Sequence, residues 1–283
     1  MRFLVRLLAI CAILVLGTLA LGSVAERWLI YPFDPTRTPP SEAGLAGVTE
    51  NEIALGDETL IVWSTPPNPG QPVIFYLHGN AGNLANRAGR FRRFQERGYG
   101  LVALAYPGST GSTGTPTQDN LNEAAQHIWR IRSELLPSAY RASNPSTTLL
   151  YGESLGTTVA IHLNADETSQ NSTTLPDAII LEAPFTSIAG LAEYHYPGTG
   201  DLAKNMQNQW DSLALADQLF QPLLIVHGTK DDLIPIEMGQ QVFSAAPSRK
   251  KVFITVKGAG HTGLWRSDTL PRLWTFIDQF ALR

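Results

Sequence analysis

The sequence contains almost no cysteine and comparatively little charge. Its single cysteine, Cys11, excludes a disulfide framework and a structural zinc site built from cysteine thiolates. Lysine and arginine number 21 against 25 aspartates and glutamates, a balance that disfavours a nucleic-acid-binding protein. Charged residues make up 16% of the 283 residues, below the roughly 25% of typical soluble domains. This deficit predicts either an apolar membrane segment or a surface that is polar but uncharged.

The longest uncharged apolar run lies at the N-terminus, at residues 7–25, and follows Arg2 and Arg6. As a helix, its 19 residues would span about 28 Å, close to the roughly 30 Å of a bilayer core. One interpretation is an uncleaved anchor; the other is a signal peptide cleaved after Ala25, which would give a secreted protein. The run is long for a secretory core, which favours an anchor over residues 1–25. Either interpretation places the rest of the chain on the extracytoplasmic side.

The rest of the chain divides into a proline-rich segment at 26–50, predicted to be an extended connector, and a catalytic domain at 51–283. The domain opens with a hairpin around Gly56-Asp57 and then alternates short apolar runs with helical patterns. Strands are expected at 72–78, 101–106, 147–151, 178–181, 222–226 and 251–256, and helices at 86–97, 118–136, 155–163, 236–245 and 268–280. This alternation predicts an α/β fold with a mostly parallel sheet covered by helices on both faces.

The expected strand at 147–151 leads into Gly152-Glu153-Ser154-Leu155-Gly156, a G-x-S-x-G pattern. Between a buried strand and a helix, this pattern is typical of a nucleophile elbow, in which a strained turn exposes the serine. The two glycines allow the close backbone approach that such a turn requires. The N-terminus of the following helix stabilises negative charge that develops beside it. Ser154 is therefore the predicted nucleophile.

A serine hydroxyl needs a base to remove its proton, and His261 is the strongest candidate among six histidines. In folds with this elbow the order along the chain is serine, acid, histidine, which excludes His78 and His127. His261 follows the last expected strand in a glycine-rich loop. The remaining three are less suitable as the base. His162 lies within the helix that follows the serine, and His195 precedes any candidate acid. His227 ends a strand, where a buried structural role is expected.

The acid of the triad is expected in the loop after the strand at 222–226. Asp231 and Asp232 lie there side by side, and either carboxylate could orient the imidazole and stabilise its charged form. Spacing alone does not choose between them.

The oxyanion hole needs two backbone N–H donors. One is the amide of Leu155, directly after the nucleophile. The other is expected in the loop 78–83, after the strand at 72–78, where small residues allow the backbone to approach a substrate oxygen. We nominate the amide of Asn80, with Ala81 as the neighbouring option.

These motifs resemble those of the α/β-hydrolase superfamily over nearly all of residues 51–283. The segments 77–83, 151–156, 181–187 and 227–235 are more narrowly similar to a membrane-anchored branch, the Bem-type, serine aminopeptidase-like group, which includes depalmitoylating thioesterases. In that group the acid is the fifth residue counted from the histidine of H-G-x-x-D. The resemblance therefore implies Asp231 as the acid, and it also favours the N-terminal anchor. The loop at 106–111 departs from the group because it lacks the usual arginine.

The expected reaction is hydrolysis of a carboxylic ester or thioester through an acyl-enzyme on Ser154. Peptide hydrolysis, implied by aminopeptidase-like relatives, ranks second because no acidic site for a peptide N-terminus is identifiable. A non-catalytic scaffold ranks third because the triad is intact. No cofactor or metal is expected, and the expected partners are a small-molecule or acyl substrate and the membrane, not nucleic acid.

Only residues 183–221 are available for a cap, so a minimal cap and an open site are expected. Tyr194, Tyr196 and Trp210 are candidates to line a pocket there, although ordinary packing is favoured for each one taken alone.

Overall fold

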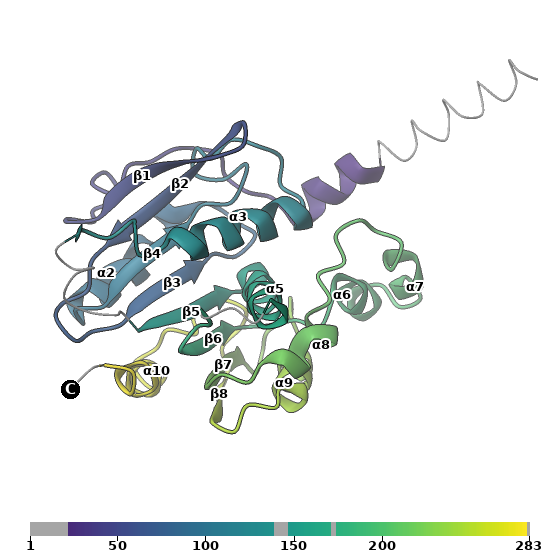
Figure 1. Cartoon of the computed structure of the whole chain (residues 1–283). Helices are drawn as coiled ribbons and strands as arrows, with labels where there is room; N and C mark the ends of the chain where they lie inside the picture. The colour runs from purple at the N-terminus through teal and green to yellow at the C-terminus, as the bar shows by residue number, and fades with distance from the viewer. Residues whose placement is uncertain (1–21, 139–146, 171–173, 282–283) are drawn as a thin grey trace, which may run out of the picture.

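The protein folds around one central sheet (Figure 1). The structure, a computed structural model, describes residues 22–138, 147–170 and 174–281. Within these ranges eight strands pair in the order β1-β2-β4-β3-β5-β6-β7-β8. They are β1 (Thr49–Leu55), β2 (Glu58–Thr65), β3 (Val73–Leu77), β4 (Gly100–Leu104), β5 (Thr148–Glu153), β6 (Ala178–Glu182), β7 (Leu223–Gly228) and β8 (Lys251–Val256). Only the β1–β2 and β2–β4 pairings are antiparallel, which confirms the predicted mostly parallel sheet.

Helices cover both faces of the sheet. The longer ones are α2 (Ala88–Glu96), α3 (Gln118–Ile131), α5 (Leu155–Ser169), α9 (Ile236–Ala245) and α10 (Leu270–Asp278). Because side chains alternate along a strand, Phe75 of β3 joins the apolar cluster under α3, α5 and α9. Its neighbour Tyr76 joins the cluster under α2 and α10. The central strands are thus buried on both faces, as their continuous apolar runs predict.

The topology brings several loops to one edge of the sheet. Strand β3 pairs in parallel with β4 on one side and with β5 on the other. The strands that follow β3 along the chain are therefore added first to one side of it and then to the other. In open α/β sheets, sites form beyond the carboxyl ends of the strands near such a switch point. The loops that follow β3, β5, β7 and β8 carry every residue predicted to act in catalysis.

A short excursion between β6 and β7 forms the cap. It contains α6 (Ile188–His195), α7 (Gly200–Ala203), α8 (Ser212–Leu215) and the 3-10 turn η2 (Ala216–Gln218). Helices α6 and α7 project beside the N-terminal helix, away from the main body of the sheet (Figure 1).

The N-terminal residues described here pack onto the domain. Residues 22–30 are helical, and the segment 26–50, predicted to be an extended connector, contacts the loop after β3. Phe33 forms a parallel bridge with Gly82, and the amide of Asp34 donates to the Gly82 carbonyl at 3.1 Å. Most of the predicted anchor, residues 1–21, lies outside the described residues. In the part of the chain that the structure describes, no helix is long and apolar enough to cross a bilayer.

Candidate active site

Ser154 occupies a strained turn between β5 and α5. Its backbone has φ 51° and ψ −116°, a conformation that side-chain-bearing residues rarely adopt and that marks functional turns. A Cβ at Gly152 would clash with the Gly156 carbonyl, and one at Gly156 would clash with the Leu77 carbonyl. The amide of Ser154 donates to the Glu182 carbonyl of β6 at 2.8 Å. The glycines of the motif therefore permit a turn that projects the serine beyond the sheet.

His261 connects the serine to an aspartate. Its Nε2 lies 3.0 Å from Ser154 Oγ, and its Nδ1 lies 2.9 Å from Asp231 Oδ2. With Nδ1 donating to the carboxylate, Nε2 is free to accept the serine proton. Asp232 is exposed, so the structure brings Asp231 rather than Asp232 to the histidine. This placement agrees with the choice that the family resemblance implies.

The Asp231 carboxylate is buried and held from several sides. Its Oδ1 accepts from the amides of Leu233 and Ile234 at 3.1 and 2.8 Å, and Oδ2 also lies 3.5 Å from Nε2 of His227. Burial raises the pKa of Asp231, but the hydrogen bonds from His227, His261 and the Ile234 amide outweigh it and leave the pKa below its ordinary value. The carboxylate therefore stays ionised and fixed in orientation.

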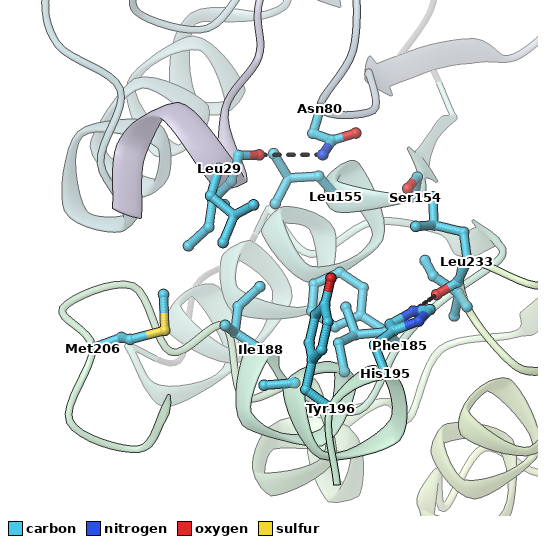
Figure 2. Close-up of a pocket in the computed structure, with 14 residues that line it drawn as sticks. Leu29, Asn80, Ser154, Leu155, Phe185, Ile188, His195, Tyr196, Met206 and Leu233 are labelled. Carbon is cyan, nitrogen blue, oxygen red and sulfur yellow. Dashed lines mark hydrogen bonds between the residues drawn. The ribbon is translucent and has the colours of Figure 1, made fainter. Parts of the chain in front are cut away.

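The two predicted oxyanion donors lie beside the serine. Asn80 and Leu155 both line the cavity that Ser154 opens into (Figure 2). Leu155 begins α5 directly after the elbow, and Asn80 lies in the loop after β3. Ala81, the neighbouring option, is exposed and does not line this cavity. The Asn80 side chain donates to the Ile30 carbonyl at 3.2 Å, which holds this loop against the N-terminal helix.

The cavity next to Ser154 has a volume of about 360 Å³ and a mostly apolar wall. The cap contributes residues from α6 and the turn after α7, and the N-terminal helix contributes the opposite wall (Figure 2). The apolar lining residues are Leu29, Ile30, Leu155, Phe185, Ile188, Leu191, Ala192, Met206, Leu233 and Ile234. This volume lies at the lower end of the 300–1,000 Å³ range of small-molecule sites. The wall suits an acyl chain better than a charged group.

Of the three aromatic residues considered for this pocket, one lines it. Tyr196, at the end of α6, is part of the wall, whereas Tyr194 is exposed and does not line it. Trp210 is fully buried and donates from Nε1 to the Tyr31 hydroxyl at 2.8 Å, so it belongs to the core.

Three of the histidines set aside by chain order or position have other partners. His78 donates from Nδ1 to the Gly79 carbonyl at 2.7 Å, and burial lowers its pKa to about 3. His162 packs edge-on against Trp210, and burial lowers its pKa to about 4. His195 lines the cavity and donates from Nε2 to the Leu233 carbonyl at 2.8 Å. It therefore joins the cap to the loop that carries Asp231.

Two buried ion pairs beneath the elbow were not anticipated from the sequence. Arg87 donates from Nε to Glu153 Oε2 at 3.1 Å, and Arg90 donates from Nη2 to Glu182 Oε1 at 2.7 Å. Burial raises the pKa of Glu153, but the positive charges of Arg90 and Arg87 hold it at about 2. A usable signal was present: Glu153 and Glu182 both end strongly apolar strands, where a carboxylate needs a partner.

The wall formed by the N-terminal helix was also missed, because Leu29 and Ile30 precede the expected domain boundary at residue 51. Among the described residues, no group of three or more histidine, aspartate or glutamate side chains is placed to hold a metal ion.

The chain is similar to several known proteins in sequence and in fold. The chain is 26% identical over 257 residues to an uncharacterized protein of Mycobacterium tuberculosis, covering 89% of this chain and 86% of that protein. It is 31% identical over 235 residues to the lysophosphatidylserine lipase ABHD12 of Rattus norvegicus, covering 71% of this chain but only 54% of the lipase. No protein-family model matches the chain.

Among solved structures, a soluble variant of the monoglyceride lipase of Saccharomyces cerevisiae superposes with a TM-score of 0.63 at 13% identity. The match covers 89% of this chain and 99% of that one, so the two share a fold. With the topology and the elbow described above, these likenesses show that the chain is a hydrolase of the α/β-hydrolase superfamily.

Proposed function

We propose that the protein is a serine hydrolase that cleaves carboxylic esters of single long acyl chains, such as those of monoacylglycerols and lysophospholipids. One observation carries the proposal: the hydrogen-bonded series Ser154–His261–Asp231 opens directly into an apolar cavity of about 360 Å³. The names of the rat and yeast relatives, a lysophosphatidylserine lipase and a monoglyceride lipase, support this substrate class.

The geometry supports a two-step reaction. Ser154 Oγ attacks the ester carbonyl as its proton passes to Nε2 of His261, and Asp231 stabilises the imidazolium that forms. The amides of Leu155 and Asn80 stabilise the oxyanion of the tetrahedral intermediate. As that intermediate collapses, the C–O bond to the leaving alcohol breaks and His261 gives its proton to the alcohol. Water then attacks the acyl carbonyl as its proton passes to His261. The bond between the acyl carbon and Ser154 Oγ breaks, His261 returns the proton to Oγ, and the fatty acid is released.

The proposal includes an N-terminal membrane anchor at residues 1–25 and a catalytic domain on the extracytoplasmic side. The helix at 22–30 supports it, because this helix contains the last residues of the apolar run and supplies Leu29 and Ile30 to the cavity wall. An anchor there would place the cavity close to the bilayer, where single-chain lipids reside.

A thioester would react by the same steps, with a thiol in place of the alcohol as the leaving group. Peptide hydrolysis is less well supported. A site for a peptide N-terminus needs an acidic side chain, and the described residues that line the cavity include no aspartate or glutamate.

The test compares the full chain with Ser154→Ala on 1-monoacylglycerols, lysophosphatidylserine and aminoacyl anilides, together with labelling by a fluorophosphonate probe. We expect Ser154→Ala to lower kcat by about 10⁴- to 10⁶-fold on the lipid esters and to abolish labelling, with no loss of folding. Ser169→Ala, at the far end of the same helix, is the matched control and should keep both. Undiminished ester turnover by Ser154→Ala would overturn the proposal, and faster turnover of the anilides would favour peptide hydrolysis.

A further inference from the structure

One guanidinium, that of Arg87, joins the two loops that carry the proposed oxyanion donors. Toward the loop after β3, Nη1 donates to the Ala81 carbonyl at 2.5 Å and to the Asn83 carbonyl at 3.2 Å. Toward the elbow, Nε and Nη2 donate to the two carboxylate oxygens of Glu153 at 3.1 and 3.3 Å. The guanidinium therefore binds both carboxylate oxygens of Glu153 at the elbow and two backbone carbonyls of the loop after β3.

The residues that Arg87 binds are adjacent in sequence to the nucleophile and to a proposed oxyanion donor. Glu153 directly precedes the nucleophile Ser154, and Ala81 directly follows Asn80, whose amide is the proposed second donor. Between the two carbonyls lies Gly82, with φ 73°, where a Cβ would clash with Asn86 Oδ1 and approach Arg87 Nη1 to 3.1 Å. The loop thus turns tightly beside the guanidinium, within two residues of Asn80.

Burial makes this arrangement rigid. The Arg87 side chain is 9% exposed and that of Glu153 is 18% exposed. The Tyr76 hydroxyl donates to Glu153 Oε2 at 2.6 Å, so this oxygen accepts from Tyr76 as well as from Arg87 Nε. A buried ion pair that loses one member leaves an unpaired charge, which costs several kcal/mol. Alternative arrangements of the loop that break these bonds are therefore rarely populated.

We propose that Arg87 is a positioning residue for the hydrolysis reaction, one that sets the distance and angle between the Asn80 amide and Ser154. This inference rests on the proposed function, because it assumes that an oxyanion forms on the Ser154 adduct. Preorganised donors are effective only when they already point at the oxyanion, and a displacement of about 1 Å can cost about 10²-fold in rate.

The neighbouring pair Arg90–Glu182 provides the matched control. Arg90 also binds both oxygens of a carboxylate, and that carboxylate belongs to Glu182, the last residue of the parallel strand β6. Arg90 lies three residues after Arg87. Among the described contacts of Arg90, none reaches the loop 79–83. A loss of fold stability would affect both arginine variants, whereas a loss of oxyanion geometry would affect Arg87 alone.

The experiment compares Arg87→Lys with Arg90→Lys in the full chain. The readouts are kcat and KM on 1-monoacylglycerols and the inhibition constant of an alkyl trifluoromethyl ketone, which forms an oxyanion on the serine. A non-hydrolysable ether analogue, which forms none, reports ground-state binding. We expect Arg87→Lys to lower kcat about 10- to 100-fold with KM changed less than about threefold, and to weaken the ketone by a similar factor but not the ether. Arg90→Lys should lower the melting temperature while kcat stays within about threefold.

Equal effects of the two lysine variants on kcat, or equal weakening of ketone and ether by Arg87→Lys, would overturn the inference. If Arg87→Lys does not fold, Glu153→Gln is compared with Arg90→Lys as its control. Failure of the proposed function looks different, because Ser154→Ala would then keep wild-type turnover whatever the arginine variants do.

Discussion

The Glu26 carboxylate accepts hydrogen bonds from both the backbone amide and the side-chain amide of Asn208, at 2.6 and 2.5 Å, across 182 positions of the chain. The side-chain oxygen of Asn208, Oδ1, accepts from the Tyr31 hydroxyl at 2.7 Å and from the backbone amide of Gln118 at 2.6 Å. Asn208 is buried, so this group of bonds fastens the N-terminal helix to both the cap and the start of α3. The helix that continues the apolar run is thus a structural part of the hydrolase domain.

This fastening predicts different results for two truncations. A chain beginning at residue 22 keeps Glu26 and the cavity wall, so its kcat/KM on a detergent-dispersed monoacylglycerol should match that of the full chain. A chain beginning at residue 37 loses the wall and leaves the Asn208 amides without their partner, at a cost of about 1–3 kcal/mol for each unpaired buried group. Its melting temperature should fall by about 5–10 °C and its kcat/KM at least 10-fold. Equal activity and stability of the two chains would contradict this role of the helix.

Glu26→Gln tests the same contact without removing chain. The amide keeps the size of the side chain and one acceptor oxygen but loses the charge, so a smaller drop in melting temperature is expected. Glu42→Gln, an exposed residue of the same segment, is the control and should leave the melting temperature unchanged. Thermal unfolding followed by circular dichroism measures both.

The sequence predicted the parts of the site that follow local rules. Ser154 is predicted from a strand, two glycines and a helix in order, and His261 from its place after the last strand; the structure brings the two side chains within 3.0 Å of each other. Contacts that depend on distant partners left no such pattern. Glu26 precedes Asn208 by 182 residues, and nothing in the proline-rich segment indicates that it folds back. Charged residues on a helix are usually solvated, so Arg87 itself gave no sign of its partner; the signal lay only in Glu153, a carboxylate at the end of the apolar strand β5.

Neutralising each of the two adjacent aspartates after β7 should have very different effects on kcat. Asp231→Asn removes the charge that orients His261 and stabilises its imidazolium, and the amide favours the wrong tautomer, so kcat should fall about 10³- to 10⁴-fold. Asp232→Asn changes an exposed side chain and should keep kcat within about twofold. Steady-state kinetics on one monoacylglycerol measures both. A severe loss in Asp232→Asn alone would reassign the acid.

The cavity wall should determine which acyl chains are accepted. Ile188, on α6, lies in the wall, so Ile188→Trp would fill part of the 360 Å³. We expect the optimal chain to shorten, with kcat/KM for a long-chain monoacylglycerol falling at least 10-fold relative to that for a butyryl ester. Leu202→Trp, at an exposed position on α7 that does not line the cavity, is the matched control. An unchanged chain-length profile in Ile188→Trp would place the acyl chain elsewhere.

His162 should make the protein less stable in mild acid. Burial against Trp210 lowers its pKa in the folded chain to about 4, whereas an unfolded histidine titrates near 6.5. Between these values the unfolded chain binds a proton that the folded chain does not, so the free energy of unfolding falls as pH drops from about 6.5 to about 4. His78, with a pKa of about 3, acts in the same direction. In urea unfolding at pH 7 and pH 5, we expect His162→Gln to reduce the difference between the two free energies by about 1–2 kcal/mol and to leave the part due to His78. An equal fall in variant and wild type would show that His162 is not the group responsible.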